Sequence, residues 1–255
     1  QQSPVLNTDP AKLPAGARIT PGARVRLRVN AWYIHETTVA SVNGGKLTLT
    51  APTDYPAKAG WGYMLLGNNA WMLDRPGEWF HDARKRRLYA WMPDSAAPKA
   101  ALAAVTLPVG ADLQGRKYVT VDGVTVARTS VGVDLQQTTG VQWRNGSIED
   151  SAGACVAAAG SLDAVVAATQ ISRCGIDAIQ GESDAIGEAQ GMAVRGNIVR
   201  DAGVQMSGET PLTSPRHTRG ASVAGTTAVV SDNVVINSGY FGIRVHSGSR
   251  VEGNF

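Results

Sequence analysis

The clearest structural signal in this 255-residue chain lies in the segment Val194-Arg195-Gly196-Asn197-Ile198-Val199-Arg200-Asp201-Ala202-Gly203. A related segment follows at Val234-Val235-Ile236-Asn237-Ser238-Gly239-Tyr240-Phe241-Gly242-Ile243. Both combine short runs of β-prone residues with small and polar residues that suit tight turns. Two copies of one pattern indicate an internal repeat.

The repeat extends toward the N-terminus as columns of apolar residues. The first column holds Val121, Trp143, Val166, Val194 and Val230, and the second, five residues later, holds Val126, Ile148, Ile171, Val199 and Val235. A third apolar column is expected at Val133, Cys155, Ile176, Val204 and Ile243. Glycines recur near the expected turns, where the backbone must bend tightly, at Gly153, Gly175, Gly203 and Gly239.

The spacing of the columns predicts a right-handed parallel β-helix. Neighbouring first-column residues are 22, 23, 28 and 36 positions apart, which is one coil per step with loops inserted in the last two. Each coil then buries one residue of every column and stacks on the next at about 4.8 Å. A further coil begins at residues 251–255, so we expect the chain to be the N-terminal part of a longer solenoid.

The first part of the chain has a different pattern. Alternation in residues 24–29 puts three arginines on one side of a strand, and two further strands at residues 38–42 and 46–50 flank the hairpin signal Asn43-Gly44-Gly45. Five of the six tryptophans follow, at Trp32, Trp61, Trp71, Trp79 and Trp91. We therefore expect an all-β chain with an aromatic-stabilised antiparallel subdomain at 1–116 and the β-helix at 117–255.

Composition narrows the function only slightly. The net charge of +3 gives no argument for a nucleic-acid partner, and no apolar run is long enough to span a membrane. The polar start without methionine is compatible with a mature secreted protein or a trimmed one. The chain has two cysteines, Cys155 and Cys174; they lack zinc-site spacing and fall in different expected columns, so a bridge is not expected.

Two stretches resemble secreted bacterial right-handed β-helix proteins of the pectate-lyase-like superfamily. One is the run from Leu73 to Asp82 followed by Leu88-Tyr89-Ala90-Trp91-Met92-Pro93, which is similar to a segment that these proteins carry before their coils; the other is the repeat itself. The resemblance implies a secreted or periplasmic bacterial glycoside hydrolase or polysaccharide lyase. In this chain, Pro76-Gly77-Glu78-Trp79 is expected to form a turn that lays Trp79 against Trp91, with Glu78 bonding locally.

A ligand of a β-helix lies across the outside of a sheet, so candidate residues are the outward neighbours of the third column. These are Asp134, Val156, Asp177, Gln205 and Arg244, with His246 two residues further. Asp134 and Asp177 are expected two coils apart, about 10 Å, near the upper end of the carboxylate spacing in inverting glycosidases. Arg244 and His246 instead suit a lyase, as the cation and the base.

The two insertions offer further candidates. The longer one carries Arg216 and His217, which can meet a sugar. The acidic one, residues 181–188, offers a calcium site through Glu182, Asp184 and Glu188, although its spacing matches no recognised calcium loop. No cofactor is expected otherwise.

These features favour a polysaccharide-degrading, carbohydrate-active enzyme that binds an extended glycan along its outer face. Asp177, Arg244 and His246 are the catalytic candidates; Asp134, Gln205, Arg216 and His217 are the candidates for substrate binding. Hydrolysis and elimination both remain open. The alternatives are a non-catalytic module for glycan binding or adhesion, and an inactive fragment of the parent enzyme.

Overall fold

The computed structural model divides into two compact units near residue 102, and each is described by itself. The structure describes residues 4–13, 15–30, 33–53, 55–60, 63–66, 70–82, 84–99, 102, 105–183, 185–203, 219–222, 225–239 and 241–255. Nearly all of its regular structure is β-strand. The exceptions are two short 3-10 turns, Pro10–Lys12 and Ala70–Met72.

The first unit contains a five-stranded antiparallel sheet. Its strands lie in the order β1 (Val5–Asn7), β4 (Lys46–Leu49), β3 (Tyr33–Asn43), β2 (Arg24–Asn30) and β5 (Tyr63–Leu66). The predicted hairpin is confirmed, because Asn43 pairs with Lys46 and Gly44 takes a positive φ of 56°. Arg24 and Arg26 share one face, as expected, and both bond to Glu36.

Aliphatic residues, rather than tryptophans, form the core of this sheet. The buried residues include Val25, Leu27, Val39 and Leu47. Trp79 and Trp91 are 47% and 39% exposed, and Trp32 and Trp61 lie outside the described residues. The expected aromatic core is therefore wrong for the described tryptophans, because alternating Val and Leu residues already fill the buried face.

A separate hairpin follows, made of β6 (Trp79–Asp82) and β7 (Arg87–Ala90). On one of its faces, Phe80 stacks on Tyr89 with ring centroids 6.1 Å apart. The local role expected for Glu78 is confirmed: its carboxylate accepts hydrogen bonds from the backbone N–H groups of Asp74 and Arg75.

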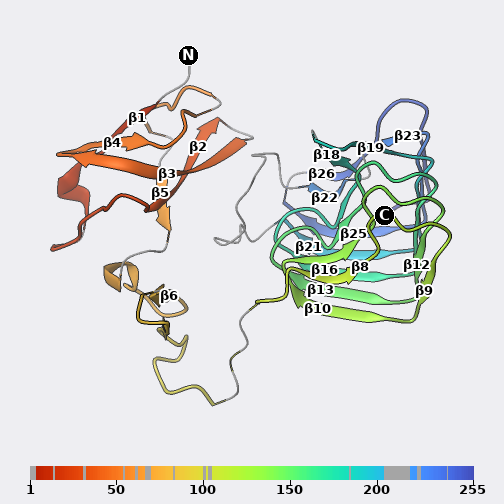
Figure 1. Cartoon of the computed structure of the whole chain (residues 1–255), viewed down its shortest axis with the longest axis horizontal. Helices are drawn as coiled ribbons and strands as arrows, with labels where there is room; N and C mark the ends of the chain where they lie inside the picture. Colours follow the sequence, from red (N-terminus) through yellow and green to blue (C-terminus); the bar gives the residue numbers. More distant parts are fainter. Residues whose placement is uncertain are drawn as a thin grey trace. The chain divides into compact units, whose positions relative to one another are not determined.

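The second unit is a stack of coils that form three parallel sheets (Figure 1). The first sheet contains β9 (Thr120–Asp122), β12 (Gln142–Arg144), β15 (Val165–Ala167), β20 (Ala193–Arg195), β24 (Val229–Ser231) and β27 (Arg250–Glu252). The second contains β10 (Thr125–Thr129), β13 (Ser147–Ser151), β16 (Gln170–Cys174), β21 (Ile198–Ala202) and β25 (Val234–Ser238). The third contains β8 (Val109–Asp112), β11 (Val131–Asp134), β14 (Val156–Ala157) and β17 (Ile179–Gln180).

Smaller pairings complete this unit. Strand β22 (Arg219–Ser222) pairs with β26 (Phe241–Arg244) and contacts β17. Strands β18 (Glu182–Ser183), β19 (Gly187–Gln190) and β23 (Gly225–Thr226) form a short sheet of their own.

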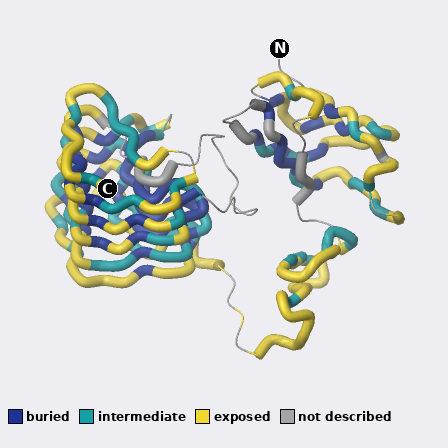
Figure 2. The backbone as a smooth tube through the Cα atoms, turned by 180° about the vertical axis from the view of Figure 1, so that it is seen from behind, coloured by how far each residue is buried: buried dark blue, intermediate teal, exposed yellow. Residues whose placement is uncertain are grey.

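The first two predicted columns are confirmed by the register of the strands. Trp143 pairs with Val121 and Val166, and Ile148 pairs with Val126 and Ile171. Their side chains fill the interior, where Trp143, Val166, Ile148 and Ile171 are fully buried. Figure 2 shows the buried positions recurring along successive coils. Each coil therefore supplies the same contacts to the next one.

The third predicted column is wrong beyond its first residue. Val133 pairs with Val156, and Val156 pairs with Ile179. These strands step by 23 residues between the first two coils, whereas the first two columns step by 22, because the corner before β14 holds one more residue. A slip of one residue exchanges the inward and outward faces, so Cys155 and Ile176 do not occupy this column.

The same shift explains a second correction, because Cys155 and Cys174 form a disulfide with their Cα atoms 5.5 Å apart. Cys155 lies in the corner just before β14, and Cys174 ends β16 of the next coil. Both residues are buried. Placing Cys155 inside the third column made the bridge seem geometrically unfavourable, and its true place at the corner allows it.

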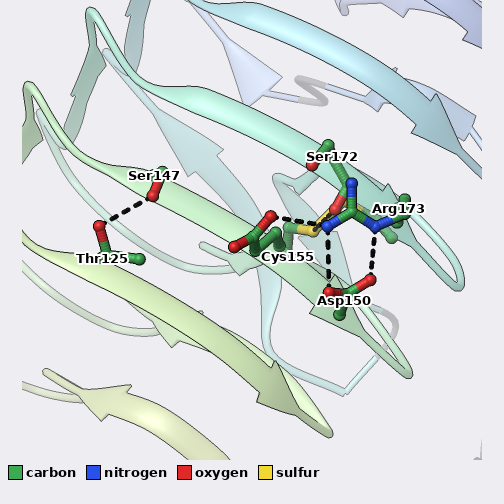
Figure 3. A network of polar contacts seen from close by, with 8 residues as sticks. Thr125, Ser147, Asp150, Cys155, Ser172 and Arg173 are labelled. Carbon is green, nitrogen blue, oxygen red and sulfur yellow. Dashed lines mark hydrogen bonds and ion pairs between the residues drawn. A yellow bond between two sulfur atoms is a disulfide. The ribbon is translucent and has the colours of Figure 1, made fainter. Parts of the chain in front are cut away.

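The corners of the coils use left-handed backbone conformations. One corner repeats this conformation in every coil at Arg128, Asp150, Arg173, Asp201 and Asn237. The expected glycine positions lie close by, but of those four only Gly203 has a positive φ. Polar side chains at this corner bond between coils: Arg173 reaches Asp150 and Glu149 of the preceding coil (Figure 3).

A second corner, directly after the first sheet, predicts a stabilising substitution. Positive φ values recur there at Gly123, Asn145, Ala168, Gly196, Asp232 and Gly253. Alanine in this region is strained by about 1 kcal/mol, and exposed Ala168 contributes little packing, so Ala168→Gly should raise the free energy of unfolding by about that amount. Urea unfolding measures it. Exposed Ala127, which has no positive φ, is the control, and Ala127→Gly should lower stability.

Buried asparagines connect the later coils inside the same corner. The Asn197 amide donates to Asn233 Oδ1 at 2.9 Å, and the Asn233 amide donates to Asn254 Oδ1 at 2.9 Å. Asn197 Oδ1 also accepts the backbone N–H of Thr169. These bonds satisfy backbone groups that the turn would otherwise leave buried and unpaired.

Candidate functional site

The candidate site is built on a hairpin inserted into the coil after β17. Its strands β18 and β19 are antiparallel and place Glu182 directly opposite Glu188. Like charges in a directly opposed pair repel each other. The pair therefore needs nearby positive charge.

That positive charge comes from the end of β26. Arg244 Nη1 donates to Glu182 Oε1 at 2.9 Å, across 62 residues of sequence. His246 lies between the two carboxylates, with Nδ1 2.7 Å from Glu188 Oε1 and Nε2 3.5 Å from Glu182 Oε2. Two carboxylates, a guanidinium and an imidazole thus meet on the side of the coil stack.

The four side chains differ in their exposure. Glu182 is nearly buried, with 8% of its side chain exposed, while Glu188 is 39% exposed. Arg244 and His246 are 33% and 25% exposed. The cluster therefore has a buried carboxylate at its base and an accessible carboxylate at its rim, and similar groups in different environments can take different chemical roles.

The structure brings together two of the residues that the sequence nominated, Arg244 and His246. It does not place Asp177 on an outward ladder: Asp177 is buried, with 3% exposed, just before β17. Val156 is fully buried too, so the expected ladder is wrong at both positions, as the register shift requires. Gln205, Arg216 and His217 lie outside the described residues, and so does Asp184 of the calcium hypothesis.

Asp134 does lie on the third sheet, where it pairs in register with Asp112 and Ala157 rather than standing in line with Asp177. Burial raises the pKa of its carboxyl, and the charge of Asp112 adds to this effect. The backbone N–H of Gln136 donates to Asp134 Oδ1 at 2.9 Å and offsets part of the effect.

The raised pKa of Asp134 predicts a dependence of stability on pH. Its folded pKa lies above the ordinary value of 3.8, so the folded state binds the proton more tightly and stability falls as pH rises through that interval. Asp134→Asn should therefore raise the thermal midpoint at neutral pH, and the gain should vanish in acid. The oxygen that accepts from Gln136 is retained.

Asp150 provides the opposite control. Its hydrogen bond to Arg173 lowers the pKa of the Asp150 carboxyl, so its contribution is present at neutral pH and is lost as pH falls. Asp150→Asn should lower the midpoint at neutral pH. Equal shifts in the same direction for the two variants would contradict the assignment of opposite pKa changes.

Sequence reasoning treated Glu182 and Glu188 only as calcium ligands and did not pair them with Arg244 and His246. The 28-residue step between Val166 and Val194 showed that something was inserted there. A glutamate near each end of an insertion that also contains Gly187 was the available signal for a hairpin. Its contact with β26 depends on the stacking of later coils, which no local pattern shows.

The repeated register of short parallel strands defines the class of this protein: it is a parallel β-solenoid with a side hairpin. The family model for the right-handed β-helix region matches residues 108–255, more than half of the chain. The chain therefore belongs to the right-handed β-helix family. A search of curated proteins finds no match. Among the described residues, no helix is long and apolar enough to cross a membrane.

Proposed function

We propose that this protein is a carbohydrate-active enzyme that hydrolyses a polysaccharide at the cluster of Glu182, Glu188, Arg244 and His246. The observation that carries the proposal is the approach of two differently buried carboxylates, with ligand oxygens within 4.8 Å of each other, on the side of the solenoid. Paired carboxylates are the chemical equipment of most glycoside hydrolases. The rigid coils beside them offer a long surface to an extended chain.

The two carboxylates suit two roles in breaking a glycosidic bond. Glu182 is paired with Arg244, which favours its ionised form, so it can stabilise positive charge at the anomeric carbon. Glu188 is more exposed and can donate a proton to the departing glycosidic oxygen. Water then supplies the hydroxyl group that ends on the anomeric carbon, which completes the hydrolysis.

Elimination has weaker support. A lyase needs a cation that is available for the uronate carboxylate, but Arg244 already bonds to Glu182. A non-catalytic binding module has weaker support too, because glycan binders commonly use a row of exposed aromatic residues. Among the described residues from 105 onward, the exposed aromatic side chains are Tyr118, Phe241 and Phe255, and they do not belong to one strand column.

The buried disulfide supports an oxidising location. Disulfides persist in secreted and periplasmic proteins and are rare in the cytosol. The Cys155–Cys174 bridge is therefore in keeping with the proposal that the protein acts outside the cytoplasm, on a glycan encountered there.

The experiment is to incubate the protein with a panel of neutral and uronic polysaccharides and to follow two signals, new reducing ends and the ultraviolet absorbance of unsaturated products. Reducing ends without absorbance are expected. Both signals together would select elimination in place of hydrolysis. Silence across a broad panel, with the protein shown to be folded, would overturn the proposal of an enzyme.

A further inference from the structure

We propose that Glu182, Glu188 and His246 form a binding site for a divalent transition-metal ion of the zinc class. Each residue offers one ligand atom, and these atoms all lie within 4.8 Å of one another. The inference concerns metal binding itself and does not depend on the proposed glycan hydrolysis.

The spacing between His246 Nε2 and Glu182 Oε2 favours an ion between them. At 3.5 Å this contact is longer than a good hydrogen bond between nitrogen and oxygen. Two ligands that each lie about 2.1 Å from a tetrahedral zinc ion are separated by about 3.4 Å. The two atoms therefore already stand at the distance that a shared ion requires.

Contacts around the three residues hold them as a ligand set. Arg244 bonds to Oε1 of Glu182, and the other oxygen, Oε2, is the one nearer to His246. Glu188 Oε1 lies 2.7 Å from His246 Nδ1, a carboxylate contact that orients an imidazole ring as in many metal sites. Glu188 is more than a third exposed, so a small movement of its side chain brings a carboxylate oxygen to the ion.

The chemistry of these ligands selects the kind of ion. Calcium takes six to eight oxygen ligands, whereas an imidazole suits zinc and its neighbours. Including His246 therefore points away from the calcium ion that an acidic hairpin alone suggests. Three protein ligands also leave a coordination position for water or a sugar hydroxyl.

Metal binding can be measured without any glycan. Protein stripped with a chelator is titrated with zinc chloride by calorimetry, and calcium chloride is titrated in parallel. We expect one zinc ion per chain, bound more tightly than calcium. His246→Ala should weaken zinc binding at least about tenfold. Exposed His81, on β6 of the other unit, is the matched control, and His81→Ala should leave zinc affinity unchanged.

X-ray absorption at the zinc edge of the wild-type protein provides a second measurement that needs no variant. A shell of oxygen ligands with one imidazole nitrogen supports the site. No zinc binding, equal losses in the two histidine variants, or a shell without imidazole would overturn it. Because these readouts contain no substrate, their failure leaves glycan hydrolysis untouched, and an inactive protein that binds zinc leaves the metal site in place.

Discussion

Replacing Glu188 with glutamine is expected to lower the rate of glycan hydrolysis by about 10²- to 10⁴-fold, the usual contribution of a positioned proton donor. Glutamine keeps the length of the side chain and an oxygen that can accept from His246, but it cannot deliver a proton. The quantity to measure is kcat/KM on the polysaccharide that gives the strongest signal in the panel. The thermal midpoint, recorded in parallel, should change little.

Glu149 is the matched control for this substitution. Its side chain is 40% exposed, against 39% for Glu188, and it also pairs with a basic residue, Arg173, on the outside of the coils. Glu149→Gln should leave kcat/KM within about twofold of wild type, because surface substitutions away from a site usually have small effects. Comparable losses in the two variants would mean that Glu188 has no special role.

Trp143→Ala is expected to cost about 3–5 kcal/mol of unfolding free energy, a large share of the stability of an ordinary domain. Trp143 is the largest fully buried side chain and lies in register between Val121 and Val166, so truncation opens a cavity beside both neighbouring coils. The close stacking of parallel strands prevents the coils from collapsing into that space. Denaturant unfolding followed by circular dichroism measures the loss.

Trp143→Phe separates packing from polarity at the same position. The indole Nε1 is buried without a hydrogen-bond partner, so phenylalanine keeps much of the apolar volume and removes an unsatisfied donor. Its cost should stay below about 1.5 kcal/mol. If the two variants lost equal stability, the cavity explanation would be wrong.

Much of the fold could be predicted because its strongest signal repeats. Val126, Ile148, Ile171 and Val199 each occupy the same place in a coil, so an error at one coil is corrected by the next. The third sheet had no such protection. One additional corner residue before Val156 shifted the register, and the errors at Asp177 and at the disulfide followed from that shift.

The candidate site was predictable only in part. Arg244 and His246 stood out as a cation and an imidazole in one strand region, and Glu182 and Glu188 stood out as acids in an insertion. Nothing local linked the two pairs, because 62 residues separate Arg244 from Glu182. Their contact depends on how β17, β22 and β26 stack.

By itself, the amino-acid sequence determined the coiled architecture, since apolar residues repeated once per coil have one way to share a continuous core. Only the tertiary structure decided which residues share a site. Corner lengths set the register of each sheet, and a hairpin reaches a later coil through stacking, so the meeting of Glu182, Glu188, Arg244 and His246 depends on the sum of many small backbone turns rather than on any one segment.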